Sequence, residues 1–131
     1  DFDLEDFEYR SDARRFELGT PALPTVHTAL GGQELVDEIG IDAIVERNRT
    51  LTEHLVDGAR SAGFSVRLAD PERRTSIVMI CHEDPTTAVR HLAEHDVIVD
   101  HRPGFVRVSP HFYNTEEDID RCVQVLAAFS G

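Results

Sequence analysis

Arg107 is the residue of this sequence whose surroundings point most directly to chemistry. It is the one cation in the apolar and uncharged run 105–114. Residues 105–108 predict a short buried strand, and Asn114 with Glu117 three residues later predicts a helix N-cap with a capping box. An arginine between a strand and a capped helix is well placed to hold an anion. The pattern fits equally an arginine at an exposed strand position that pairs with a nearby carboxylate.

The histidines offer a second kind of chemistry. His91 and His95 are four residues apart on a predicted helix, which is the spacing of two ligands to one metal ion. No Cys-x-x-Cys pair and no His-Glu-x-x-His run accompanies them. We therefore predict surface histidines and no metal site. His111, which follows Ser109-Pro110, could line a pocket or close the turn that it occupies.

Two segments carry a resemblance to a known family. The run Arg-Val-Ser-Pro-His-Phe-Tyr-Asn-Thr-Glu-Glu-Asp-Ile-Asp-Arg, residues 107–121, resembles the C-terminal signature of class V, fold-type I pyridoxal-phosphate enzymes. That family includes cysteine desulfurases, kynureninases and related aminotransferases. Residues 15–21, Arg-Phe-Glu-x-Gly-Thr-Pro, are similar to another segment of the same family. The two segments occur in the family's order, and the resemblance covers approximately residues 14–131.

The resemblance implies roles for particular residues. In the family, an arginine at the position of Arg107 binds the α-carboxylate of an amino-acid substrate. A threonine at the position of Thr20 reaches across a homodimer to the cofactor phosphate, and Gly19 beside it lets the backbone approach a phosphate closely. Without the resemblance, residues 19–21 read as a plain loop before a helix.

The segment Asp-His-Arg-Pro, residues 100–103, resembles a stretch of kynureninase-like members that faces the active site. It implies that Arg102 and His101 line the substrate site, where the planar forks of two arginines suit a carboxylate. A β-turn with Pro103 and Gly104 at its centre explains the same residues. No cysteine lies between residues 97 and 113, where many cysteine desulfurases carry a catalytic one. A kynureninase-like hydrolase or an aminotransferase is therefore favoured.

Lysine is absent: all 13 basic residues are arginine. A pyridoxal-phosphate enzyme holds its cofactor as a Schiff base on a lysine amine. If the resemblance holds, this chain contains no catalytic residue and is the small C-terminal domain of a longer enzyme. The lysine and the rest of the cofactor site would then belong to an upstream large domain.

The positions of apolar residues predict the elements that place these side chains. Their order is α-α-β-β-α-β-β-α, which suggests an α+β two-layer sandwich with a small, mostly antiparallel sheet. Asp84, followed by Pro85, is predicted to cap the third helix. The predicted helices cover residues 24–39, 42–62, about 85–95 and 115–128, and the predicted strands 64–68, 76–81, 97–99 and 105–108.

Length and composition limit the function further. The 131 residues suit one domain, which we place at 14–131 after a lead-in segment at 1–13 that could form an edge strand. The formal net charge of −12 argues against nucleic acid and anionic membranes as partners. Two cysteines are too few for a disulfide framework and predict a reduced, cytoplasmic protein.

A second hypothesis remains open beside the enzyme fragment. The chain could be a free-standing α+β module that binds or senses a small carboxylate and catalyses nothing. Such a module should bury the apolar residues of its lead-in segment on its own core, whereas a fragment should leave them exposed. These residues are Phe2, Leu4, Phe7 and Tyr9.

Overall fold

The computed structural model describes residues 8–17, 19–70 and 73–129, and it divides the chain into two compact units, residues 1–39 and 40–131. The lead-in residues Phe2, Leu4 and Phe7 lie outside the described part, whereas Tyr9 is 71% exposed. The domain boundary placed after residue 13 stays a prediction. Within the described part, no helix is long and apolar enough to cross a membrane.

The first unit contains a short 3₁₀ helix, η1 (Ala13–Phe16), and a long helix, α1 (Leu23–Ile39). The carboxylate of Asp12 accepts the backbone N–H of Arg14 at 3.0 Å and so caps η1. No residue of α1 is buried, and its larger apolar side chains are exposed: Leu23, Val26, Leu30, Leu35 and Ile39. The helix predicted over 24–39 is confirmed.

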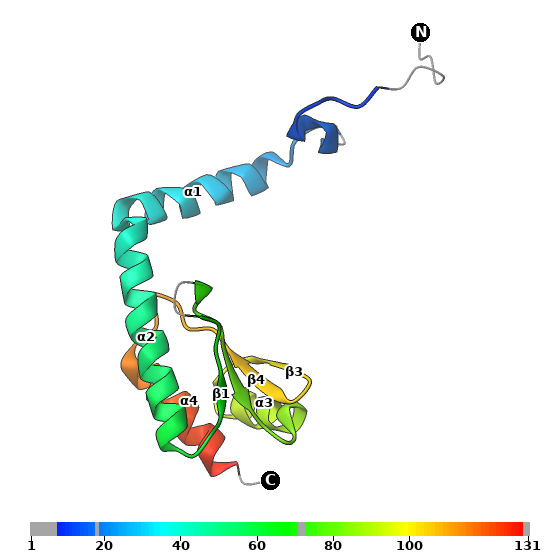
Figure 1. Ribbon diagram of the computed structural model, residues 1–131. Helices are drawn as coiled ribbons and strands as arrows, with labels where there is room; N and C mark the ends of the chain where they lie inside the picture. Colours follow the sequence, from blue (N-terminus) through cyan, green and yellow to red (C-terminus); the bar gives the residue numbers. More distant parts are fainter. Residues whose placement is uncertain (1–7, 18, 71–72, 130–131) are drawn as a thin grey trace. The chain divides into compact units, whose positions relative to one another are not determined.

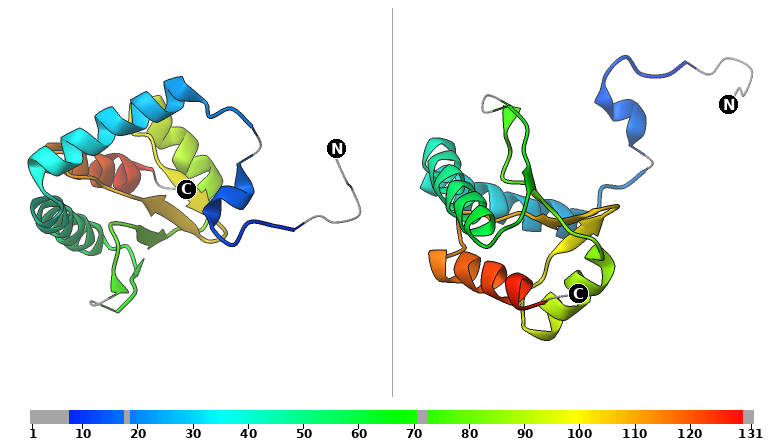
Figure 2. Two further views of the ribbon diagram at one scale, coloured as in Figure 1. Left: turned by 90° about the horizontal axis from the view of Figure 1, so that it is seen from above. Right: turned by 60° about the horizontal axis from the view of Figure 1, so that its bottom comes forward.

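The second unit is a two-layer α+β sandwich, as predicted. Its elements follow the order α2 (Ile41–Ser61), β1 (Val66–Arg67), β2 (Val78–Cys81), α3 (Pro85–Glu94), β3 (Asp100–Arg102), β4 (Phe105–Val108) and α4 (Glu116–Ala128). The four strands form one antiparallel sheet in the order β1-β2-β4-β3. Figures 1 and 2 show α2, α3 and α4 against one face of this sheet.

The core lies between the sheet and these three helices. Val78 of β2 pairs directly with Val108 of β4, and Ile80 pairs with Val106. Directly paired residues point to the same face of a sheet, so all four side chains meet the helices. The helices contribute the remaining core side chains: Leu51, Leu55, Val56, Ala59, Ala88, Leu92, Ile119, Cys122 and Leu126.

Two expectations need correction. The third strand was predicted at 97–99 but lies at Asp100–Arg102, three residues later. The last helix is capped by Thr115 and not by Asn114. The Thr115 hydroxyl accepts the N–H of Asp118, and the Asp118 carboxylate accepts the N–H of Thr115, which completes a capping box one residue after the predicted position. The predicted cap of α3 at Asp84 is confirmed.

Candidate functional site

A two-residue turn fixes the register of the hairpin that carries the arginines. Pro103 and Gly104 connect β3 to β4, and Gly104 has a φ of 81°, a left-handed conformation that glycine adopts without strain. The carbonyl of Gly104 accepts the N–H of His82 at 3.1 Å, which ties the turn to the end of β2. The turn therefore sets Asp100 directly opposite Arg107.

Arg107 and Arg102 lie on the sheet face that points away from the helices. Arg107 pairs with Met79 of β2 on one side and with Asp100 of β3 on the other. Arg102 is opposite Phe105, two residues before Arg107 on the same strand, so it shares that face. We call this surface the open face. The structure therefore brings together the two arginines that the sequence singled out.

The carboxylate of Asp100 lies between the two guanidinium groups. Its Oδ2 accepts a hydrogen bond from Nη1 of Arg102 at 2.6 Å, and Nη1 of Arg107 is 3.5 Å from the same oxygen. The N–H of His101 donates to Oδ1 of Asp100 at 2.7 Å. This backbone hydrogen bond, followed by the contact with Arg102, lowers the pKa of Asp100 from its ordinary value. Asp100 is therefore ionised near neutral pH and balances one of the two positive charges.

The two arginines carry one more positive charge than Asp100 neutralises, and this charge can attract an anionic ligand. Arg107 is held to Asp100 at the limit of hydrogen-bonding distance, and its side chain is 32% exposed. A guanidinium carries five N–H donors, so Arg107 can bind a carboxylate in bidentate fashion while Arg102 keeps Asp100 in place. Sequence reasoning allowed a pairing of Arg107 with a nearby carboxylate but did not identify Asp100 as that group.

His101 lies on the opposite face of the sheet from both arginines. It pairs with Val106, whose side chain is in the core, and it is half-buried on the side where α3 packs. The structure thus does not bring His101 to the Arg102–Arg107 pair. Its assisting role in substrate binding stays a prediction.

His111 occupies the turn between β4 and α4. Its N–H donates to Oδ1 of Asn114 at 2.9 Å, and its ring stacks on Tyr113 with the ring centroids 5.0 Å apart. Nδ1 of His111 is buried without a hydrogen-bond partner among the described residues. The backbone N–H of His111 therefore helps to close the turn, as one of the two sequence interpretations predicted.

Arg47 of α2 holds this turn, and sequence reasoning missed it. Its guanidinium binds both carboxylate oxygens of Glu116 and donates to the carbonyl of Asn114 at 3.0 Å. The contact with Arg47 lowers the pKa of Glu116 to about 2. Arg47 thereby links α2 to the segment that directly follows Arg107.

Most of the second unit matches the sequence model of a known protein family. Residues 44–126 match the family described as the kynureninase C-terminal domain. This match covers more than half of the chain and includes both Arg102 and Arg107.

The chain belongs to the kynureninase C-terminal domain family.

Full-length relatives agree with this membership. An uncharacterized aminotransferase of Bacillus subtilis, YcbU, is 31% identical over 94% of this chain, and a kynureninase of Bacillus mycoides is 29% identical over 95%. The chain spans about a third of the length of these relatives, 33% and 31%. The resemblance to class V pyridoxal-phosphate enzymes drawn from the two sequence segments is confirmed.

Solved structures confirm the fold of this kynureninase C-terminal domain. A cysteine desulfurase from Thermococcus onnurineus superposes with a TM-score of 0.81 at 19% identity, over 98% of this chain and 36% of the desulfurase. An alanine–glyoxylate aminotransferase from Nostoc sp. superposes with a TM-score of 0.71 at 20% identity, over 89% of this chain and 34% of the aminotransferase. At these identities, the likeness is one of fold.

Gly19 and Thr20 lie in the first unit, and their role toward the cofactor phosphate stays a prediction. Gly19 has a φ of 142°, and no atom of the described residues lies within 4 Å of the place where a Cβ would be. Thr20 is exposed, so its hydroxyl is accessible. The Schiff-base lysine of a pyridoxal-phosphate site cannot come from these 131 residues, because none is a lysine. These residues can therefore form only part of a cofactor site.

The geometry gives less support to a reactive thiol at Cys122 or to a metal site at His91 and His95. Cys122 is buried in the core, and its burial raises the pKa of its thiol to about 11, so it stays protonated near neutral pH. The rings of His91 and His95 lie 4.4 Å apart between centroids. In the described part of the chain, no group of three or more histidine, cysteine, aspartate or glutamate side chains is arranged to hold a metal ion.

Proposed function

We propose that this chain is the small domain of a longer, pyridoxal-phosphate-dependent enzyme that acts on an amino acid, and that Arg107 binds the substrate carboxylate. The observation that carries the proposal is the pair of guanidinium groups, Arg102 and Arg107, around Asp100 on the open face. Family membership supplies the context, because the chain corresponds to a third of relatives that are named kynureninase and aminotransferase. Of the reactions in this family, a kynureninase-like hydrolysis or an amino transfer fits the absence of cysteine from residues 97–113.

Arg107, Asp100 and Arg102 have distinct tasks in this proposal. Arg107 binds the carboxylate of the substrate through two parallel N–H···O contacts and so fixes its orientation. Asp100 holds Arg102 beside it and prevents two neighbouring positive charges from repelling each other. Pyridoxal phosphate, when bound, supplies the electron sink for bond breaking at the α-carbon. This chain contributes the orientation of the substrate.

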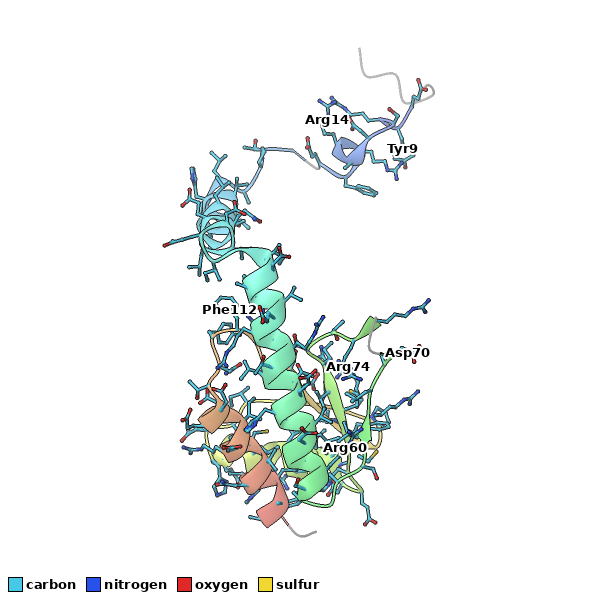
Figure 3. All side chains as sticks on the ribbon, turned by 60° about the vertical axis from the view of Figure 1, so that its left-hand side comes forward. Tyr9, Arg14, Arg60, Asp70, Arg74 and Phe112 are labelled. Atoms are coloured by element: carbon cyan, nitrogen blue, oxygen red, sulfur yellow. The ribbon has the colours of Figure 1, made fainter. Side chains whose placement is uncertain are left out.

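Arg107→Ala tests the proposal in the longer enzyme. Loss of the bidentate contact should cost about 2–4 kcal/mol of transition-state binding, or roughly a 30- to 700-fold loss in kcat/KM, seen largely in KM. Arg60→Ala is the matched control, because Arg60 is an exposed arginine in the last turn of α2 and does not lie on the open face (Figure 3). Steady-state kinetics with the amino-acid substrate measures both. Equal kcat/KM values for the two variants would refute the carboxylate role.

We further propose that the enzyme is a homodimer in which Thr20 contacts the cofactor phosphate bound to the partner subunit. The exposed hydroxyl of Thr20 and the open approach at Gly19 support this contact. Thr20→Val should lower the cofactor content of the purified longer enzyme, whereas Thr20→Ser keeps the hydroxyl and should retain it. Absorbance of the bound cofactor per subunit is the measurement. Normal cofactor content in Thr20→Val would contradict the phosphate role.

A further inference from the structure

His82 is a half-buried residue whose backbone and ring hold two different segments of the second unit. It directly follows β2, and its backbone N–H donates to the carbonyl of Gly104 at 3.1 Å. Nδ1 of its ring accepts the backbone N–H of Asp84, also at 3.1 Å. His82 therefore connects the turn of the β3–β4 hairpin to the residue that caps α3.

Two phenylalanines hold the ring of His82 in this position. Phe129, at the end of α4, is stacked on it with the ring centroids 5.6 Å apart and the planes inclined by 29°. Phe64, which lies between α2 and β1, is stacked on it with the centroids 6.4 Å apart. Both phenylalanines pack against the hydrophobic core. A change in the charge of the ring therefore acts on its hydrogen bonds, because the packed rings restrict its rotation.

The hydrogen bond from Asp84 requires one particular form of the imidazole. A ring nitrogen that accepts an N–H carries no proton, so the ring of His82 is neutral and its proton is on Nε2. Histidine is the side chain whose charge ordinarily changes between about pH 5 and pH 8. A second proton, on Nδ1, would place two donors against each other and break this hydrogen bond.

A carboxylate beside the ring offers the protonated form another partner. Hydrogen bonds from Thr87 lower the pKa of Asp84 from its ordinary value, and the nearby His82 acts in the same direction. Asp84 is therefore ionised near neutral pH and attracts a protonated ring. Its Oδ1 now accepts the N–H of Thr87 at 3.1 Å as the cap of α3, and a donating imidazole would compete for this carboxylate.

Other ionisable groups lie farther from the ring. His91 of α3 contacts the same Phe129, with the centroids 5.1 Å apart, and the ring of His95 lies 4.4 Å from that of His91. Both would repel a protonated His82 when they are themselves protonated. Further ionisable side chains on the described elements around the ring are Cys81 of β2, Glu83, Arg90 of α3 and His101 of β3.

The two forms of the ring favour two arrangements of residues 82–84. In the neutral form, Nδ1 accepts the N–H of Asp84, whereas a protonated ring would donate to the carboxylate of the same residue. The change shifts the backbone at His82, whose N–H holds the carbonyl of Gly104. Because the turn at Gly104 sets the positions of Arg102 and Arg107, the charge of the ring affects the open face.

We propose that His82 is a pH-dependent latch on the β3–β4 hairpin, closed when its ring is neutral and released when its ring is protonated. The closed latch holds Arg102 and Arg107 in the arrangement described above. The released latch frees the turn at Gly104, so the open face binds a carboxylate more weakly at acid pH. This last effect rests on the proposed function, whereas the movement of the hairpin does not.

NMR spectroscopy of the ligand-free 131-residue chain between about pH 8 and pH 5 tests the latch. Long-range ¹H–¹⁵N correlations should show His82 with its proton on Nε2 at the higher pH. As the pH falls, the amide signals of Asp84, Gly104 and Phe105 should shift with the same midpoint as the His82 ring. The protection of the His82 N–H against hydrogen exchange, corrected for the intrinsic effect of pH, should fall about tenfold.

Two substitutions of His82 separate its hydrogen bond from its stacking. His82→Phe keeps an aromatic ring without an acceptor, so the amide signals of residues 104–105 should lose this transition. His82→Asn places an amide oxygen near the position of Nδ1 and does not titrate, so the protection of the N–H at position 82 should persist at both pH values. His91→Gln is the control, since it removes a neighbouring imidazole and should leave the transition in place.

Four outcomes would overturn the proposal. They are a neutral His82 ring with its proton on Nδ1, amide shifts at residues 104–105 that do not follow the His82 ring, an unchanged transition in His82→Phe, or its loss in His91→Gln. The last two would assign the pH response to another group. Since no ligand is added, none of these outcomes bears on the carboxylate role proposed for Arg107.

Discussion

Glu116 shows how one residue ties the candidate site to its scaffold. Arg47 binds both of its carboxylate oxygens and also the carbonyl of Asn114, so three parts of the chain depend on one guanidinium. The turn held in this way begins just after Arg107. A charge-assisted contact of this kind fixes a loop in one conformation, although its partial exposure limits its contribution to stability.

This contact should make stability depend on pH in a defined window. In the folded chain the pKa of Glu116 is about 2, against an ordinary value of 4.5. A carboxyl with a lowered folded pKa stabilises the fold above its unfolded pKa, and that stabilisation is lost as pH falls through the folded pKa. The melting temperature of Glu116→Gln should therefore lie below that of the native chain at pH 6, and the difference should vanish as pH falls from 4.5 toward 2.

Glu117→Gln is the matched control for this prediction. Glu117 is the next residue along α4, it is exposed, and among the described residues it interacts with Arg47 through charge and not through a hydrogen bond. Its substitution should leave the melting temperature nearly unchanged across the same pH range. Thermal unfolding followed by circular dichroism measures both variants. A pH-independent difference for Glu116→Gln would show that its ion pair does not act through the carboxylate charge.

The position of Asp100 could have been derived from the sequence, whereas the contact between Arg47 and Glu116 could not. A two-residue turn at Pro103-Gly104 makes residue 102 pair with 105, and therefore 100 with 107. The pairing of Asp100 with Arg107 therefore follows from the position and length of the turn alone. The contact of Arg47 with Glu116 depends on how α2 packs on α4, and no local pattern encodes that packing.

Among the elements, the misplaced third strand has a clear cause. Val97, Ile98 and Val99 are apolar and β-branched, which locally favours a strand. However, the N–H of Val97 bonds back to the carbonyl of Leu92 at the end of α3, and Ile98 is 83% exposed. The hairpin turn, and not local propensity, sets where the ladder with β4 begins. The four α-helices and the other three strands were predicted correctly in type and order because their apolar periodicities are unambiguous, whereas the 3₁₀ helix η1 was not predicted.

The cap of α4 gives a prediction at this scale. Asn114–Glu117 and Thr115–Asp118 both have the spacing of a capping box, and the structure uses the second pair because the Asn114 side chain accepts the N–H of His111. Thr115→Ala should lower the free energy of unfolding by about 1 kcal/mol, because the N–H of Asp118 loses its acceptor.

Urea denaturation of the purified chain measures this loss. Thr86→Ala is the control, since Thr86 is an exposed threonine in the first turn of α3, where Asp84 is the cap. It should change the free energy of unfolding by less than about 0.5 kcal/mol. If Thr115→Ala were as stable as Thr86→Ala, the cap would have to be assigned to Asn114.

For the molecule as a whole, the two units differ in what stabilises them. In the described part of the chain, the buried core residues all lie within residues 44–126, whereas α1 buries none of its residues. An isolated helix of the length of α1 is marginal in water, because most helical stability in proteins comes from packing of an apolar face. The sequence showed the apolar positions of α1 but could not show that they are exposed among the described residues.

We therefore expect residues 40–131 to fold without the first unit. A chain that begins at Gly40 should keep the melting temperature of the 131-residue chain within about 2 °C, because it retains every buried contact of the core. Differential scanning calorimetry measures both chains, and a chain of residues 40–131 with Leu55→Ala is the reference for a damaged core. That reference should lose about 2–5 kcal/mol, since Leu55 is fully buried. A shortened chain as unstable as this reference would show that α1 contributes to the core of the second unit.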